Sequence, residues 1–164
     1  MPGPPQGLET TAIATIAQGV SITPRASRAA ARPPPWPAPL AATTVSCILP
    51  VKDMARARRF YEQSLGLEPS GEKPDGKFVY QVGATEIALF PRPEGTRATH
   101  TALSFRVADI AAAVRALEAR GVAFADYDLP GLKTIEHVCV LGAEKAAWFT
   151  DPEGNILCLH EDIA

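Results

Sequence analysis

Cys158 and His160 combine a thiol with a possible base at a spacing that can do chemistry. They stand two positions apart in a strand-like run, and a regular strand points residues two apart to the same face. A thiol beside an imidazole can act as a nucleophile with its general base. The alternative is that Cys158 is a small apolar wall residue, because free cysteine is among the most buried residue types. We favour this second interpretation.

Other catalytic patterns are missing from the sequence. Gly71, Gly76 and Gly83 are separated turn glycines and do not form a phosphate-binding loop. No GxSxG motif supports a hydrolase nucleophile. A formal net charge of -2 gives no basic footprint for nucleic acid. We therefore expect no cofactor and no nucleic-acid partner.

The cysteine content and hydropathy indicate the cellular environment. The three cysteines are an odd number without a CxxC pair, which favours a reducing compartment over a disulfide framework. No run of about 18 apolar residues is present, so nothing predicts a membrane span. The expected location is the cytoplasm.

Residues 1–42 differ in composition from the rest of the chain. They contain nine of the 16 prolines, and such a segment cannot bury enough surface to offset its ordering entropy. We predict a disordered extension there and one folded domain over residues 43–164. Three arginines against Glu9 alone resemble an organelle transit peptide, but a dispensable tail or an overextended start is favoured.

The folded part contains an internal repeat at an offset of 56 residues, which places Val107 and Asp109 over Val51 and Asp53. Each half opens with an apolar strand, at 45–51 and 101–107. An aspartate then caps a helix that ends at a glycine, and each helix has an apolar face. These faces contain Met54, Ala57, Tyr61 and Leu65 in the first half, and Ile110, Ala113, Val114 and Leu117 in the second.

Further strands are expected after each helix, at 78–82 and 85–90, and at 122–127, 136–141, 146–150 and 155–160. A Pro-Glu-Gly sequence closes the last hairpin. The pattern predicts an α+β fold of tandem βαβββ modules. Their curved sheets would surround a cleft, with the helices outside and a pocket at the junction of the modules.

Two motifs resemble a known family. The opening Val51-x-Asp53, Phe60-Tyr61 and Leu65-Gly66-Leu67 is similar to that of glyoxalase/bleomycin-resistance/dioxygenase (vicinal oxygen chelate) domains. The closing segment 149–155, Phe-Thr-Asp-Pro-Glu-Gly-Asn, resembles the last hairpin of the same family. The resemblance covers residues 43–162. These motifs indicate the fold and supply no catalytic groups themselves.

The resemblance implies four metal-ligand positions in metal-dependent members. Here they fall on Ser46, Ala102, Ala88 and Cys158. A divalent ion needs several converging nitrogen and oxygen donors, which these residues do not supply. A displaced site of His100, Cys158 and His160 is conceivable by strand parity. We expect no metal and treat the displaced site as the alternative.

Strand parity assigns a small, apolar and aromatic lining to the cleft. It consists of Ser46, Ile48, Tyr80, Ala88, Ala102, Ser104, Trp148, Cys158 and His160. This lining suits a small, largely apolar or aromatic organic molecule. The hypothesis is a metal-free binding protein, similar to the drug-sequestering branch of the family.

Two other functions remain open. The first is a glyoxalase-like lyase or a dioxygenase that uses displaced metal ligands, or a metal-free lyase that uses general acid–base groups. The second is an idle domain that serves as an interaction module. The resemblance also implies a homodimer with pockets at or near the subunit contact.

Overall fold

The computed structural model describes residue 40 and residues 43–163. The expectation of disorder over residues 1–42 lies outside this described part, apart from Leu40. The first module runs in the order β1 (Ser46–Val51), α2 (Met54–Arg59), η2 (Phe60–Ser64), β2 (Pro69–Glu72), β3 (Phe78–Val82) and β4 (Thr85–Pro91). The segment η2 is a π-helical turn that continues α2, and Leu65 N donates to Phe60 O at its end.

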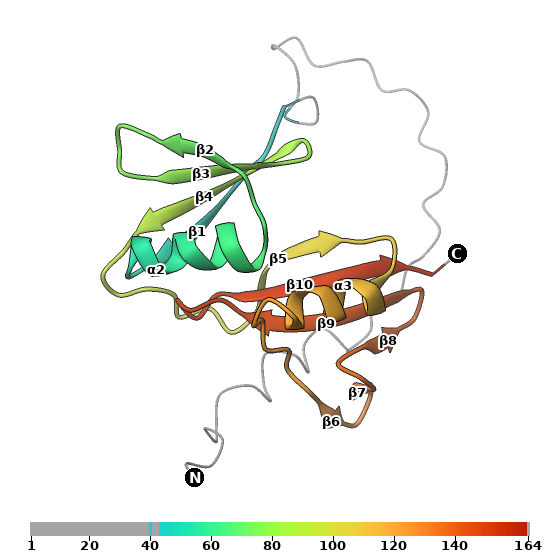
Figure 1. The fold of residues 1–164 in the computed structure, drawn as a ribbon. Coiled ribbons are helices and arrows are strands. Elements are labelled where there is room, and N and C mark those ends of the chain that lie inside the picture. Colours follow the sequence, from blue (N-terminus) through green and yellow to red (C-terminus); the bar gives the residue numbers. More distant parts are fainter. Residues whose placement is uncertain (1–39, 41–42, 164) are drawn as a thin grey trace.

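The second module follows with β5 (Thr101–Arg106), α3 (Ile110–Glu118), β6 (Asp128–Leu129), β7 (Leu132–Lys133), β8 (Cys139–Leu141), β9 (Glu144–Thr150) and β10 (Ile156–Asp162). Figure 1 shows the two modules side by side, with α2 and α3 against their sheets. None of the described helices is long and apolar enough to cross a membrane.

The two sheets have the same topology. Their strand orders are β1-β4-β3-β2 and β5-β10-β9-β8, and the first strand of each module pairs in parallel with the last. The sheets do not close into a barrel. The predicted α+β fold and the internal repeat are therefore confirmed.

Some local predictions were wrong. Residues 122–127 do not form a strand, and in this segment only Phe124 makes a bridge, to Phe149. The expected strand at 136–141 begins only at Cys139, because Glu136 and His137 have φ of 50° and 68° and form a tight turn. Strand β2 was not expected, since Pro69 and Gly71 are poor strand formers.

One hydrophobic core joins both modules. The predicted helix faces are confirmed, with Ala57, Tyr61, Ile110 and Val114 buried in it. Each helix begins at its predicted cap, since Asp53 accepts from Arg56 N and Asp109 accepts from Ala112 N, both at 2.9 Å. The helices thus cover one face of each sheet and leave the other face free of helix.

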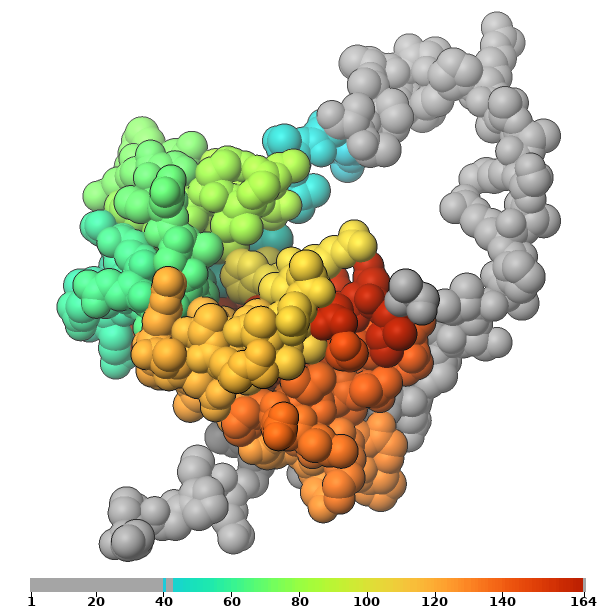
Figure 2. Space-filling view, turned by 45° about the vertical axis from the view of Figure 1, so that its right-hand side comes forward, coloured from blue at the N-terminus to red at the C-terminus, as the bar shows by residue number. Residues whose placement is uncertain are grey.

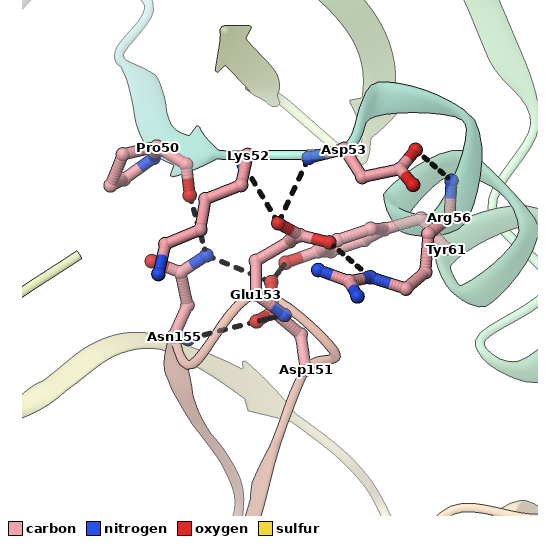
Figure 3. Close-up of polar contacts among 8 residues, drawn as sticks. All are labelled: Pro50, Lys52, Asp53, Arg56, Tyr61, Asp151, Glu153 and Asn155. Carbon is pink, nitrogen blue, oxygen red and sulfur yellow. Dashed lines mark hydrogen bonds and ion pairs between the residues drawn. The ribbon is translucent and has the colours of Figure 1, made fainter. Parts of the chain in front are cut away.

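Glu153, in the turn between β9 and β10, binds the start of α2 in the other module (Figure 3). Its carboxylate accepts from the backbone N–H groups of Lys52 and Asp53, at 2.7 and 3.1 Å, and from Arg56 Nε at 2.8 Å. Burial alone would raise the pKa of Glu153. The Arg56 guanidinium and the two backbone donors outweigh burial and hold that pKa below its usual value.

Asp151 anchors the same turn. One of its carboxylate oxygens accepts from the backbone N–H groups of Glu153 and Asn155, and the other from Tyr61 Oη at 2.8 Å and Asn155 Nδ2 at 2.8 Å. Asn155 Nδ2 also donates to Pro50 O at 3.0 Å. Asp151, Glu153 and Asn155 are 3%, 5% and 1% exposed. We call these three residues and their partners the turn network.

The turn network generates a prediction about stability. Replacing Glu153 by alanine leaves the N–H groups of Lys52 and Asp53 without their acceptor at a partly buried junction. We expect the free energy of unfolding to fall by about 3 kcal/mol. Urea denaturation followed by circular dichroism measures this change.

The control is Glu94→Ala, because Glu94 and its partner Arg92 are both 59% exposed and their oxygen–nitrogen distance is 3.5 Å. The control should change the free energy of unfolding by no more than about 0.5 kcal/mol. Equal small losses in both variants would contradict the structural role of Glu153.

Candidate functional site

The helix-free face of the second sheet carries the candidate site. In the register of the sheet, Cys158 of β10 lies between Trp148 of β9 and Ser104 of β5. Side chains alternate along each strand, so Leu157 and Leu159 point into the helix-side core while Cys158 points to the opposite face. The strand parity that was read from the sequence therefore holds for β9 and β10.

A pocket of about 290 Å³ lies on this face. Trp148 and Cys158 form its buried floor together with Ala146. The ring of Tyr127 packs edge-on against Trp148 from the side, with 5.7 Å between ring centroids. The complete lining is Thr101, Ser104, Leu141, Glu144, Ala146, Trp148, Cys158 and His160.

A few polar groups stand above this floor. Ser104 Oγ lies 2.7 Å from His160 Nδ1, so these two side chains share a hydrogen bond. Trp148 Nε1 donates to Thr101 Oγ1 at 3.2 Å, which satisfies the indole N–H. The pocket thus offers an apolar floor and, at its rim, an imidazole and two hydroxyl groups that can orient a ligand.

Cys158 is a poor nucleophile in this setting. Burial raises the pKa of its thiol to about 11, although hydrogen bonds from Ser104 and the Ala147 backbone act in the opposite direction. The thiolate is the reactive form of cysteine, and the thiol predominates below that pH. The geometry therefore fits the interpretation of Cys158 as a wall residue.

Ser46, Ile48 and Ala88 lie together on the helix-free face of the first sheet. Ile48 pairs with Ala88 in the register, and Val79 flanks Ala88 on the other side. Ser46 Oγ donates to Glu86 at 3.1 Å, and Ile48 is 55% exposed. None of these residues lines the pocket around Trp148.

The two groups of predicted residues are therefore not brought around one closed pocket. Figure 2 shows the surface hollowed between the cyan start of β1 and the yellow and red strands β5 and β10.

The expected position of Tyr80 on the helix-free face was wrong. Its ring stacks on Tyr61 at 5.9 Å in the helix-side core, and its hydroxyl donates to Glu62 at 3.2 Å. The register pairs Tyr80 with Ile87, whose side chain also faces the core. The two-residue connection at 83–84 between the expected strands implies this pairing, so Tyr80 and Ala88 cannot both face the cleft.

A β-bulge displaces Ala102. Ile156 pairs with Thr101, but the next residue, Leu157, pairs with Leu103, so Ala102 is the extra residue of β5. Ala102 packs against the helix-side core, and Thr101 takes the place in the pocket that parity had given to Ala102.

The four family positions do not fit a divalent metal. Ser46 and Ala88 lie on one sheet, Cys158 lies on the other, and Ala102 is turned toward the core. Only a hydroxyl and a raised-pKa thiol remain as donors.

The alternative metal ligands His100, Cys158 and His160 do not form a cluster either. Cys158 and His160 share the pocket, but His100 is exposed and does not line it. Within the described part of the chain, no group of three histidine, cysteine or acidic side chains lies close enough to hold a metal ion.

Several pocket residues were missed by sequence reasoning. Ala146 has the parity of Trp148 and could have been found from that spacing. Thr101 could not, because the bulge that redirects it leaves no clear signal in the sequence. Leu141 and Glu144 flank the hairpin between β8 and β9. The expected strands at 136–141 and 146–150 placed this connection, but neither residue was assigned to the lining.

Comparisons with known proteins agree with this fold. The model of the Glyoxalase/Bleomycin resistance protein/Dioxygenase superfamily matches residues 43–159. No curated protein sequence matches the chain.

Three solved structures illustrate the range of similar folds. TnmS3, an antibiotic binding protein from Streptomyces sp. CB03234, has 23% identity and a TM-score of 0.53, over 71% of this chain and 93% of its own. A putative glyoxalase family protein from Bacillus anthracis has 21% identity and a TM-score of 0.57, over 73% and 92%. Lactoylglutathione lyase from Agrobacterium tumefaciens has 19% identity and a TM-score of 0.52, over 73% and 93%.

The raised pKa of Cys158 generates a prediction about its reactivity. A shift from 9.0 to about 11 lowers the thiolate fraction at neutral pH about a hundredfold. Alkylation of Cys158 by iodoacetamide should therefore be slow at neutral pH and should speed up as the pH rises toward 11. Peptide mass spectrometry over a pH series measures the rate, with partly exposed Cys47 as the internal reference. Rapid alkylation of Cys158 at neutral pH would instead support a reactive thiol.

Proposed function

This chain belongs to the Glyoxalase/Bleomycin resistance protein/Dioxygenase superfamily, and we propose that within it the chain binds a small, largely apolar or aromatic organic molecule without a metal ion. The observation that carries this proposal is the pocket around Trp148 and Cys158, which has an apolar floor and few polar groups. A lining of this kind stabilises an apolar ligand by removing its surface from water.

The polar rim supports recognition of a neutral ligand. Ser104, Thr101 and His160 supply two hydroxyl groups and an imidazole, and Glu144 is the one carboxylate in the lining. Among the described residues, no lysine or arginine lines this pocket. A phosphate or a polyanion would find no counter-charge there, whereas a planar molecule with one or two hydroxyl or carbonyl groups would be satisfied.

Two further observations are compatible with a sequestering role. The fold is similar to that of TnmS3, an antibiotic binding protein. The family positions that would hold a metal are occupied by Ser46, Ala88, Ala102 and Cys158, which lack the donors that a divalent ion requires.

Three free cysteines are consistent with a cytoplasmic location.

A homodimer would complete the site. The first module exposes the apolar side chains of Val45, Ile48 and Phe90, which are 62%, 55% and 40% exposed. Ile48 lies on the helix-free face of the first sheet. We propose that a second copy covers this face and closes the open side seen in Figure 2.

The hydrogen bond between Ser104 and His160 favours a second candidate function. An imidazole held by a hydroxyl group in a pocket can transfer protons, as a metal-free lyase would require. Elemental analysis of protein purified without a chelator tests the other enzymatic alternative, a lyase or dioxygenase with displaced ligands. Stoichiometric zinc, nickel, iron or manganese would favour that alternative over the binding protein.

The binding function predicts a fluorescence response from Trp148. In a Trp36→Phe variant, Trp148 is the only tryptophan. We expect a subset of aromatic metabolites or antibiotics to quench or shift its emission in a saturable way, because the indole forms the pocket floor. Adding Ser104→Phe, which places bulk in the pocket, should weaken binding at least about tenfold.

The matched control adds Ala55→Phe on the exposed side of α2, away from the pocket. This control should bind as tightly as the parent variant. No response across a broad library, or equal affinity in the Ser104→Phe variant, would contradict a ligand site at Trp148.

The dimer generates a separate prediction. Ile48→Lys places a charge on the face that the second copy would cover, and burial of an unpaired charge opposes association. We expect the parent protein to sediment as a dimer and this variant as a monomer. Val140→Lys is the control, because Val140 is 63% exposed on the second module. A monomeric parent protein would contradict the proposed dimer.

A further inference from the structure

A second apolar crevice lies on the opposite side of the second sheet from the Trp148 pocket. Phe149 and Leu159 form its buried floor, and they alternate along β9 and β10 with Trp148 and Cys158. The crevice has a volume of about 310 Å³. The two sites therefore share strands but are separated by the thickness of the sheet.

The walls of this crevice come from both modules. The chain that follows η2 supplies Leu65 and Leu67. The other wall residues come from α3 and β5 of the second module and from the residues just after each of them. The last, green turn of the first helical segment lies beside α3 in Figure 1. The complete lining is Leu65, Leu67, Phe105, Val107, Ala113, Ala116, Leu117, Arg120, Phe149 and Leu159.

The crevice leaves apolar surface in contact with water. Leu65, Leu67, Phe105 and Leu117 pack against the core but are only half-buried. Covering such surface stabilises the bound state in proportion to the apolar area that is removed from water. A ligand with an apolar body of matching size would gain this energy without displacing any packed side chain.

Arg120 is the one charged residue among the described residues of the lining. It stands in the turn after α3, and its guanidinium extends across Gly66 in the first module. A Cβ atom at Gly66 would lie 2.8 Å from Arg120 Nη1, and Gly66 has φ of +73°, so this position suits glycine on both counts. The absence of a side chain at residue 66 gives the guanidinium its place at the crevice.

The guanidinium of Arg120 has no anionic partner among the residues that the structure describes. Among residues 43–163, no carboxylate oxygen lies within 4.0 Å of it. Glu118, the nearest acidic residue along the chain, instead contacts His137 Nε2 at 3.2 Å. An unpaired guanidinium at the edge of an apolar crevice can bind a carboxylate through two parallel N–H···O bonds.

We propose that this crevice binds an amphipathic monocarboxylate, such as a medium-chain fatty acid. The alkyl chain lies between Leu67 and Leu117 over the floor of Phe149, and the carboxylate pairs with Arg120. The ligand contacts both modules, so its binding stabilises their junction in addition to the turn network. This site is independent of the proposed ligand pocket at Trp148, which lies on the other face.

Octanoate is the probe, and isothermal titration calorimetry of the full-length protein measures its affinity. We expect saturable binding of one octanoate per chain. Affinity should rise about fourfold for each methylene from hexanoate to octanoate, because each buried methylene adds hydrophobic stabilisation. Neutral octanamide should bind at least about tenfold more weakly, because it cannot form the charged pair.

Two substitutions test the location. Arg120→Met keeps an unbranched apolar stem and removes the charge, so octanoate should bind about tenfold more weakly while octanamide binds as before. Ala116→Phe fills the crevice from an exposed helix position and should weaken both ligands. Arg115→Met is the control, because Arg115 is an exposed arginine of the same helix that does not line the crevice. Its octanoate affinity should equal that of the parent protein.

The outcomes decide the proposal. Loss of octanoate affinity in Arg120→Met and Ala116→Phe but not in Arg115→Met supports the site, as do amide chemical-shift changes at Leu65, Leu67 and Leu117. The proposal is overturned if octanoate does not bind, if it binds equally to all three variants, or if octanamide binds as tightly as octanoate. Fluorescence of Trp148 tests the other pocket and should not depend on octanoate.

Discussion

The arrangement of the two modules depends on the hydrogen bonds that the Glu153 carboxylate accepts from the start of α2. Glu153 is 5% exposed and can remain ionised there only while the start of α2 supplies its donors. The buried carboxylate of Asp151 likewise requires a donor from the first helical segment, the hydroxyl group of Tyr61. The last hairpin must therefore contact the first helix, and the shared core and the junction crevice follow from that contact. Apolar packing alone would tolerate a range of angles between the modules, whereas these hydrogen bonds tolerate few.

The alternation of side chains along β9 and β10 gives one pair of strands two different surfaces. Phe149 and Leu159 face the helices, and Trp148 and Cys158 face the open side. A substitution at one of these positions reaches only one of the two surfaces. The sheet thus separates a pocket lined by two hydroxyl groups, an imidazole and the carboxylate of Glu144 from a crevice that carries a guanidinium.

Sequence patterns predicted the fold well because each pattern had a local physical cause. Asp53 and Asp109 each precede an apolar helical face and cap the helix that follows. The 56-residue repeat predicted where both modules lie along the chain. The site was predicted less completely. Tyr80 was placed on the wrong face although the short connection at 83–84 implies its pairing with Ile87, because each strand was assigned its cleft residues without regard to the other. The partners of Glu153 lie about a hundred residues away along the chain, so no local pattern could indicate that its turn joins the modules.

The extra residue at Ala102 makes the two halves of the repeat unequal. The pairing of β1 with β4 is regular throughout, whereas that of β5 with β10 slips by one position. At this register shift, β5 can present a different residue to the pocket while Leu103 and Phe105 stay packed against the core. A duplicated module that acquires such a slip gains a recognition surface able to diversify while its scaffold stays constant. The two modules can then evolve separately. The regular first module maintains the assembly, and the second module determines ligand specificity.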